Sequence, residues 1–164
     1  MITYIGLAKN DLTGGIPPSI GNLTSLEILS LSNCQLGGRI PDSLKQLKNL
    51  RKISLGNNGL VGAIPSFMFN LSMLELLSFS DTQLQGSLPS NLCLSQPHLT
   101  LLGIGSNHLN GFLPPSISNC SQLEILDAHD NYLKGEIAID FRRLQHLKRL
   151  FLDDNNFGSI LLMT

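Results

Sequence analysis

LKNLRKISLGNNGLVGAIPSFMFN, residues 47–70, is the unit that the rest of the chain repeats. Counted from Leu47 as position 1, apolar residues stand at positions 1, 4, 7, 9, 14, 18 and 22. Asn58 holds position 12, Gly62 position 16 and Pro65 position 19, and the next unit opens after 24 residues. Self-similarity at such a period predicts a solenoid, in which each unit is one coil and only stacked coils bury a core.

The spacing inside the unit predicts a short strand followed by a tight turn. Ile53 and Leu55 are two positions apart, so both point inward while Ser54 faces solvent. At Asn58 the chain turns away, and the backbone groups of a buried turn need partners. An amide side chain offers donors and an acceptor, so stacked units are expected to form a structural ladder. The predicted ladder residues are Asn10, Cys34, Asn58, Asn107, Asn131 and Asn155, with Thr82 at this position in the fourth unit.

All 164 residues are predicted to form a single repeat array. Seven units begin near residues 1, 23, 47, 71, 96, 120 and 144, and the fourth is one residue longer, with its insertion around residues 93–96. Terminal repeats of a solenoid need a polar cap to stay soluble. Neither end of the sequence carries such a cap, so we expect a section of a longer solenoid or the product of a truncated gene.

Composition excludes several classes of function. The net charge is −1, and no Lys or Arg occurs between Lys52 and Lys134, so we expect no binding to nucleic acid. No run approaches the roughly 18 apolar residues of a membrane span, and the amino terminus does not resemble a signal peptide. The sequence has neither a nucleophile elbow nor a phosphate loop. We therefore predict a protein that is not an enzyme, carries no cofactor and does not itself insert into a membrane.

The three cysteines are predicted to be free thiols. Cys34 takes a ladder position, Cys120 takes an apolar position 1, and Cys93 follows an apolar leucine. A disulfide needs Cα atoms within about 7 Å of each other. If Cys93 is counted in the fourth unit and Cys120 in the sixth, a complete unit separates them, and at about 4.8 Å per stacked strand pairing is not expected.

One segment of the unit has a more specific pattern. Positions 14–19 of the first five units read LTGGIP, LGGRIP, LVGAIP, LQGSLP and LNGFLP. This L-x-G-x-[IL]-P pattern resembles the plant-specific leucine-rich repeat, and the chain is most similar to the extracellular repeats of leucine-rich-repeat receptor-like kinases. Residues 88–127 most resemble the receptor-kinase subfamily that contains bacterial-peptide and immune receptors. The resemblance implies an α/β solenoid: a right-handed superhelical arc with a parallel sheet on its concave face. Short 3-10 or extended segments would cover the convex face, and a second short strand would lie at the G-x-I-P stretch.

The same resemblance implies secretion, with the chain on the extracellular side of the plasma membrane. Three sequons agree with that setting: Asn22-Leu-Thr24, Asn70-Leu-Ser72 and Asn119-Cys-Ser121. The N-x-[ST] pattern marks a glycosylation acceptor in secreted proteins. The alternative is that N-L-[ST] simply belongs to the consensus sequence of this repeat. We keep Asn22, Asn70 and Asn119 as candidate glycosylation sites.

Positions 6, 8, 10, 11 and 13 are expected on the concave face, where equivalent side chains form columns about 4.8 Å apart. The early units place Ser and Gly there, whereas the last two present aromatic and charged residues suited to anchoring a peptide. The candidate ligand-binding residues are Asp127, His129, Asp130, Tyr132, Phe151 and Asp153. The alternative is a solvated face, with the ligand bound by other repeats. Asp127, His129 and Asp153 also invite a metal or acid–base interpretation, but no second signal supports either.

These features favour a non-catalytic recognition module, part of a plant receptor-like kinase ectodomain that binds a peptide or protein in signalling or defence. By resemblance, a co-receptor kinase is an additional partner, and the kinase domain itself would lie elsewhere in the parent gene. The alternative function is a secreted inhibitor of microbial cell-wall-degrading enzymes, similar to the polygalacturonase-inhibiting proteins.

Overall fold

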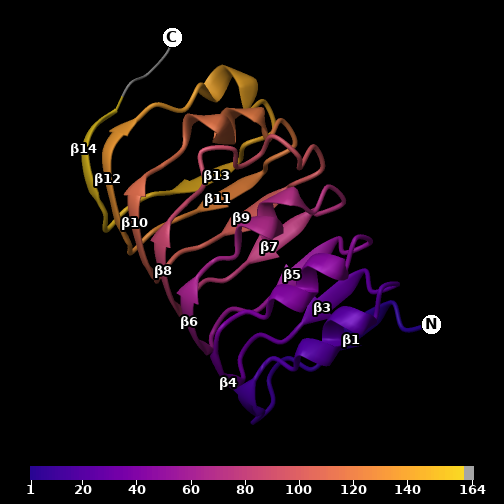
Figure 1. The fold of residues 1–164 in the computed structure, drawn as a ribbon. Coiled ribbons are helices and arrows are strands. Elements are labelled where there is room, and N and C mark those ends of the chain that lie inside the picture. The colour runs from indigo at the N-terminus through magenta and orange to yellow at the C-terminus, as the bar shows by residue number, and fades with distance from the viewer. Residues whose placement is uncertain (161–164) are drawn as a thin grey trace.

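The computed structural model describes residues 1–160, which coil into a solenoid with two parallel sheets (Figure 1). The first sheet lines the concave face and takes one three-residue strand from each unit, in chain order. Its strands are β1 (Tyr4–Gly6), β3 (Ile28–Ser30), β5 (Lys52–Ser54), β7 (Leu76–Ser78), β9 (Leu101–Gly103), β11 (Ile125–Asp127) and β13 (Arg149–Phe151). The predicted solenoid and its concave parallel sheet are confirmed.

A second parallel sheet follows the first turn of every coil, as the family resemblance implied. Its strands are β2 (Thr13–Gly15), β4 (Gln35–Gly38), β6 (Gly59–Ala63), β8 (Gln83–Ser87), β10 (His108–Phe112), β12 (Tyr132–Ile137) and β14 (Asn156–Ile160). The glycine at position 16, such as Gly62 with φ +87° or Gly86 with φ +91°, bends these strands through a conformation that L side chains rarely adopt.

Five short 3-10 helices cover the convex side: η1 (Pro18–Asn22), η2 (Asp42–Gln46), η3 (Ser66–Asn70), η4 (Pro115–Asn119) and η5 (Phe141–Arg143). The first four each follow a proline whose φ, between −62° and −74°, suits the entry to a helical turn. The sixth unit has Ala138 instead, and η5 is the shortest of the five. Within residues 1–160, no helix has the length and apolar character needed to cross a bilayer.

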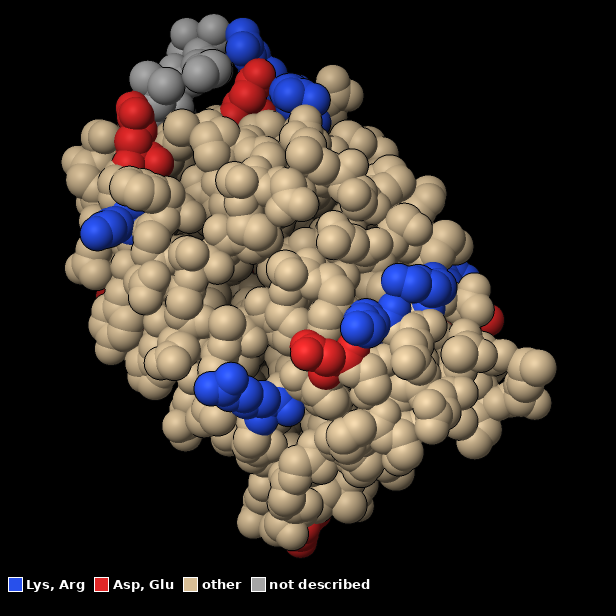
Figure 2. All heavy atoms as spheres, in the orientation of Figure 1, with Lys and Arg blue, Asp and Glu red and all other residues tan. Residues whose placement is uncertain are grey.

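The core lies between the two sheets and the 3-10 helices, and it is built almost entirely from the repeated Leu and Ile positions. The register of the first sheet steps by 24 residues, as in Ile28↔Lys52. The step from Leu76 to Leu101 is 25 residues, in the unit whose sequence is one residue longer. Uncharged residues cover most of the face drawn in Figure 2, where charged side chains stand in small separate groups.

The position-12 side chains link neighbouring coils. Asn131 shows the pattern: its Nδ2 donates to the carbonyls of Ile104 and His129, both at 3.0 Å, while its Oδ1 accepts from the N–H of Leu109 at 2.9 Å. Equivalent bonds join Asn58, Asn107 and Asn155 to the coil before each of them. At the same position, Asn10 donates to Leu7, and Cys34 reaches the same carbonyl from the second unit.

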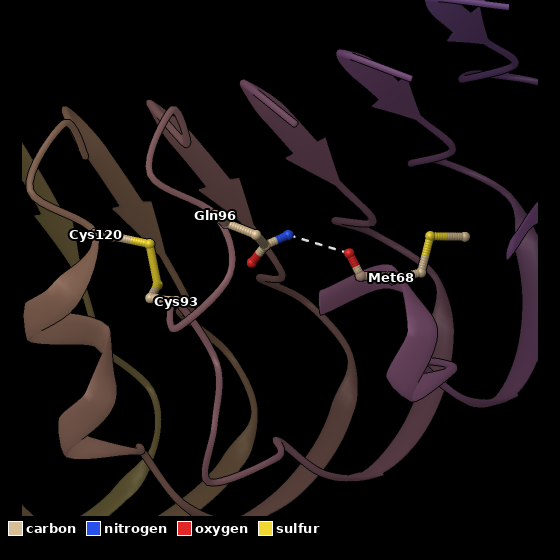
Figure 3. The surroundings of a disulfide bond; sticks show 4 residues. All are labelled: Met68, Cys93, Gln96 and Cys120. Carbon is tan, nitrogen blue, oxygen red and sulfur yellow. Dashed lines mark hydrogen bonds between the residues drawn. A yellow bond between two sulfur atoms is a disulfide. The ribbon is translucent and has the colours of Figure 1, made fainter. Parts of the chain in front are cut away.

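The prediction that Cys93 and Cys120 are free thiols is wrong: they form a disulfide, with Cα atoms 5.1 Å apart (Figure 3). Both cysteines stand at a unit boundary, Cys93 in the turn before the fifth unit and Cys120 as the first residue of the sixth. One coil spacing therefore separates them, whereas counting whole units doubled that distance. Cys34 is the free cysteine, as predicted, and is half-buried.

The disulfide lies beside Gln96, which occupies the apolar position 1 of the fifth unit and is completely buried. Its Nε2 donates to the carbonyl of Met68 at 3.1 Å, which ties the start of the fifth unit back to η3 (Figure 3). Its Oε1 has no hydrogen-bond partner among the described residues. The longer fourth unit is thus held by one covalent and one polar link in place of regular apolar packing.

The terminal coils bury less apolar surface than the inner ones. Leu150 in β13 is 38% exposed, whereas the equivalent Leu126 in β11 is completely buried. Ile2 and Leu7 in the first coil are likewise exposed. Each inner coil has a neighbour on both sides, and burial in a solenoid comes from those neighbours.

Candidate functional site

Four of the six predicted ligand-binding residues lie together at the carboxyl ends of β11 and β13. Asp127 and Phe151 end their strands, and His129 and Asp153 follow two residues later in each coil. Because the strands pair in register, with Asp127 beside Phe151, the side chains come together in pairs from two adjacent coils. They line an open hollow of about 350 Å³ on the concave face, which we call the concave hollow.

The His129 ring is held on both sides. Its Nδ1 lies 2.6 Å from Oδ1 of Asp127, and its Nε2 lies 3.1 Å from the hydroxyl of Ser106 in the preceding coil. The hydrogen bond to Asp127 is the main reason that the pKa of His129 lies above its ordinary value of 6.5. The negative charges of Asp127, Asp153 and Asp130 raise the pKa further, while partial burial opposes them.

Two residues of this arrangement were missed by the sequence analysis, Gly105 and Ser106. A Cβ atom on Gly105 would collide with the His129 ring and lie 2.7 Å from Oδ1 of Asp127, so the glycine provides the space that the pair occupies. Ser106 anchors the far side of the ring. Their positions in the repeat could have indicated this, since Gly105 is at position 10 and Ser106 at position 11 of the coil that precedes the coil of His129.

The other two predicted residues lie apart from the hollow's lining. Asp130 sits in the turn after β11 with a left-handed φ of 49°, and its side chain is exposed. Tyr132 begins β12 and therefore belongs to the second sheet. Its ring stacks on that of His108 with centroids 5.9 Å apart, and it lines a different cavity. The six residues thus do not form one continuous patch.

Ser106, His129 and Asp127 follow the order of contacts in a hydrolase triad, but the backbone around them is already engaged. The N–H groups of Ser106 and Asn107 donate to the carbonyls of His129 and Asp130, at 2.9 and 3.1 Å. Neither amide is therefore free to stabilise an oxyanion, which is the function a triad needs beside it. Among residues 1–160, no group of three His, Cys, Asp or Glu side chains is placed to hold a metal ion.

Small side chains line the rest of the concave sheet. Ser32 and Ser54 share a hydrogen bond of 2.6 Å between their hydroxyls. A Cβ on Gly103 would come within 3.2 Å of the Ser80 hydroxyl, so this part of the sheet is flat and close to the backbone. A ligand lying along it could approach the main chain but would find few anchoring groups before the concave hollow.

The three sequon asparagines are the last residues of η1, η3 and η4, so all three stand at the same point of alternate coils. Asn22 and Asn70 are exposed, and Asn119 is half-buried beside the disulfide-bonded Cys120.

Sequence comparison identifies leucine-rich repeats in the chain through two different profiles. The profile for leucine-rich repeats in two copies matches residues 24–67, and the profile for the single leucine-rich repeat matches residues 1–23 and 98–120. No curated protein matches the sequence.

Solved structures of plant receptors are similar to nearly the whole chain. The Arabidopsis receptor kinase HAESA, in complex with the peptide hormone IDA and the co-receptor SERK1, has 30% identity and a TM-score of 0.91 over 96% of this chain and 26% of that one. A TDR receptor has 34% identity and a TM-score of 0.91, over 95% and 27%. The plant peptide hormone receptor RGFR1, in complex with RGF2, has 32% identity and a TM-score of 0.87, over 92% and 24%.

The chain spans about a quarter of the length of each of these receptor chains. The similarity nevertheless extends over nearly all of the present sequence, including both sheets. Repeat arrays of this kind use their extended concave surfaces for binding, which agrees with a non-catalytic module. From the repeat register, the profile matches and these structures together, the chain belongs to the leucine-rich-repeat family, in the form found in plant receptor kinases.

Proposed function

We propose that this array is part of a plant receptor ectodomain and binds a peptide or protein ligand on its concave face. The observation that carries the proposal is the similarity to HAESA, whose structure was solved with a peptide hormone and a co-receptor. RGFR1 supports it, since its structure also contains a peptide. Recognition, rather than chemistry, is then the task of the concave sheet.

The concave hollow is the anchoring point that we assign to this ligand. Phe151 offers an exposed aromatic face, and buried aromatic anchors dominate the energy of most peptide interfaces. Asp127 and Asp153 supply carboxylate acceptors, and the His129 ring is fixed by Asp127 and Ser106. Groups already held in place lose little entropy when a ligand arrives. The small side chains of the preceding coils let an extended peptide lie close to the sheet.

A display library of random linear peptides, selected on the folded chain, tests this assignment. We expect enriched peptides whose affinity falls by about 2 kcal/mol or more in Phe151→Ala, the size of an interface hot spot. Phe112→Ala is the matched control, because Phe112 is an exposed aromatic on the second sheet. Selection that enriches no peptide, or peptides that bind Phe151→Ala as tightly as the wild type, would count against the concave hollow.

The proposed setting is extracellular, with a co-receptor kinase as a further partner and a kinase domain encoded in the parent gene. The Cys93–Cys120 disulfide supports this setting, since such bonds persist in oxidising compartments. Transcript sequence beyond the codon for Thr164 tests the gene structure: it should encode a membrane span and then a kinase signature.

Glycosylation of Asn22, Asn70 and Asn119 is part of the same proposal. Their shared position at the ends of 3-10 helices would place the glycans on one edge of the solenoid, away from the concave sheet. Secretion from plant cells followed by enzymatic deglycosylation should lower the mass and convert occupied asparagines to aspartate. Unmodified peptides at all three sequons would refute this part.

A further inference from the structure

The second sheet carries a groove that the concave site does not use. It has a volume of about 630 Å³ and crosses the strands diagonally, from the end of β4 to the start of β12. Four strand spacings of about 4.8 Å give it a length of about 19 Å. Gly62 and Gly86 are among its lining residues, and a Cβ on Gly86 would meet only the Cβ of Ala63 within 4 Å, so the groove comes close to the backbone there. We call it the second-sheet groove.

The two ends of this groove differ in chemistry. At one end, the rings of His108 and Tyr132 are stacked, with 16° between their planes, and 55% of Tyr132 is exposed. At the other end lies Arg39, whose side chain extends over Gly62. Arg39 makes no ion pair with any carboxylate of residues 1–160. One end is therefore an aromatic platform, and the other is a cation that pairs with no carboxylate of residues 1–160.

Between the two ends the groove presents amides. Gln85 and Asn110 are exposed on adjacent strands β8 and β10, and each amide both donates and accepts hydrogen bonds. The strand backbones are paired in parallel register, as in Ala63↔Gln85 and Gln85↔His108. A ligand lying across the strands would meet few free backbone groups and could not add to the sheet as a further strand. Recognition must come from the side chains.

We propose that the second-sheet groove binds an oligosaccharide that carries a carboxylate. The apolar C–H face of a sugar ring can stack on the exposed ring of Tyr132, which is both flat and amphipathic. Sugar hydroxyls are donors and acceptors at once, and they match the amides of Gln85 and Asn110. A uronic acid carboxylate at the far end would meet the planar guanidinium of Arg39, a pairing that is often bidentate. An open groove with a polar group on each of several successive strands suits a chain of rings.

Binding to paired oligosaccharides tests the proposal. The probes are hexasaccharides of β-1,4-, β-1,3- and α-1,4-linked glucose, each compared with the same chain oxidised at C6 to the uronic acid. We expect at least one oxidised hexasaccharide to bind more tightly than its neutral counterpart. Tyr132→Ala should weaken both forms about fivefold or more, through loss of the stacking face. Arg39→Gln should remove about tenfold of the preference for the oxidised form and leave neutral binding nearly unchanged.

Matched controls keep the result specific to the groove. Phe112→Ala removes an aromatic of the same sheet that is 62% exposed, and Arg143→Gln removes an exposed arginine outside the groove; neither should change binding. Phe151→Ala separates this site from the concave hollow, so oligosaccharide binding should survive in it. Thermal unfolding checks that each variant is folded. Failure of the whole panel to bind, binding of peptides alone, or binding insensitive to both Tyr132→Ala and Arg39→Gln would overturn the proposal.

Discussion

At the scale of single residues, His129 is a group whose charge state depends on its neighbours. It bonds to Asp127 and Ser106 at once, and the surrounding carboxylates favour its protonated form. The raised pKa means that the folded chain holds the proton more tightly than the unfolded one. The resulting stabilisation is complete below the ordinary pKa of 6.5 and disappears as the pH rises through the higher folded-state pKa.

This leads to a prediction for the pH dependence of the concave hollow. NMR titration of the His129 ring should give a pKa above 6.5 in the wild type, and Asp127→Asn should lower it. Gly105→Ala should also lower it, because a Cβ there would displace the ring and carboxylate from each other. Gly158→Ala is the control, since a Cβ at that position meets no atom within 4 Å. The same pKa in Asp127→Asn and wild type would contradict the assigned cause.

Asn131 gives a second prediction at this scale, for stability. Asn131→Ala would leave the buried N–H of Leu109 without its side-chain acceptor and would remove one of the two donors to each of the Ile104 and His129 carbonyls. Leaving a buried donor unpaired costs about 1–3 kcal/mol, so we expect a loss of that size in the free energy of unfolding. Urea denaturation measures it, with the exposed Asn156→Ala as the control. Equal denaturation midpoints for the two variants would show that the ladder does not stabilise the coils.

At the scale of elements, the irregular fourth unit differs from the others because a disulfide and a buried hydrogen bond link its end to neighbouring coils. Its extra residue interrupts the regular return of the chain, no 3-10 helix forms between η3 and η4, and Gln96 replaces an apolar residue. The disulfide closes a segment with a sequence separation of 27 residues across this break. Position-5 ion pairs, Arg51 with Glu75 and Lys148 with Glu124, also link neighbouring coils, but they are exposed and contribute little.

The disulfide carries a prediction of its own. In the chain-entropy account, closing a loop of this length stabilises the folded state by about 3–4 kcal/mol. Replacing Cys93 and Cys120 together by alanine should lower the urea midpoint accordingly, with the largest gain in amide exchange at the turn before β9. Cys34→Ser is the control, because Cys34 forms no disulfide and should change stability by less than about 1 kcal/mol. A variant as stable as the wild type would contradict the account.

At the scale of the whole molecule, stability should vary along the solenoid. Each coil is stabilised by its neighbours, and within residues 1–160 the first and seventh coils have a neighbouring coil on one side. Leu150 and Ile2 are exposed, whereas Leu77 in the fourth coil is completely buried. The two parallel sheets also give the molecule two separate surfaces, the concave hollow on one and the second-sheet groove on the other.

Native-state hydrogen exchange should show this gradient. We expect the amides of β1 and β13 to exchange at least about tenfold faster than those of β5 and β7, because local opening costs least where fewest contacts are broken. Strands from one sheet and of one length serve as internal controls for one another. Uniform protection along all seven coils would indicate that the array opens as a single cooperative unit, against this expectation.

The sequence alone determined the repeat period, the seven coils, the inward Leu and Ile and the position-12 residues. Each of these depends on spacing along one coil, and spacing can be read directly from a sequence. It also selected the four side chains of the concave hollow, because neighbouring coils align position by position. Through the resemblance of L-x-G-x-[IL]-P to the plant-specific repeat, the second strand was implied as well.

Only the tertiary structure decided which side chains meet across coils and across sheets. It paired Cys93 with Cys120, separated Tyr132 from Phe151, and brought Gly105 and Ser106 to His129. In each case the outcome depends on where a coil bends and on the direction in which a side chain leaves the backbone. Those quantities are fixed by packing between coils, which the one-dimensional repeat does not contain.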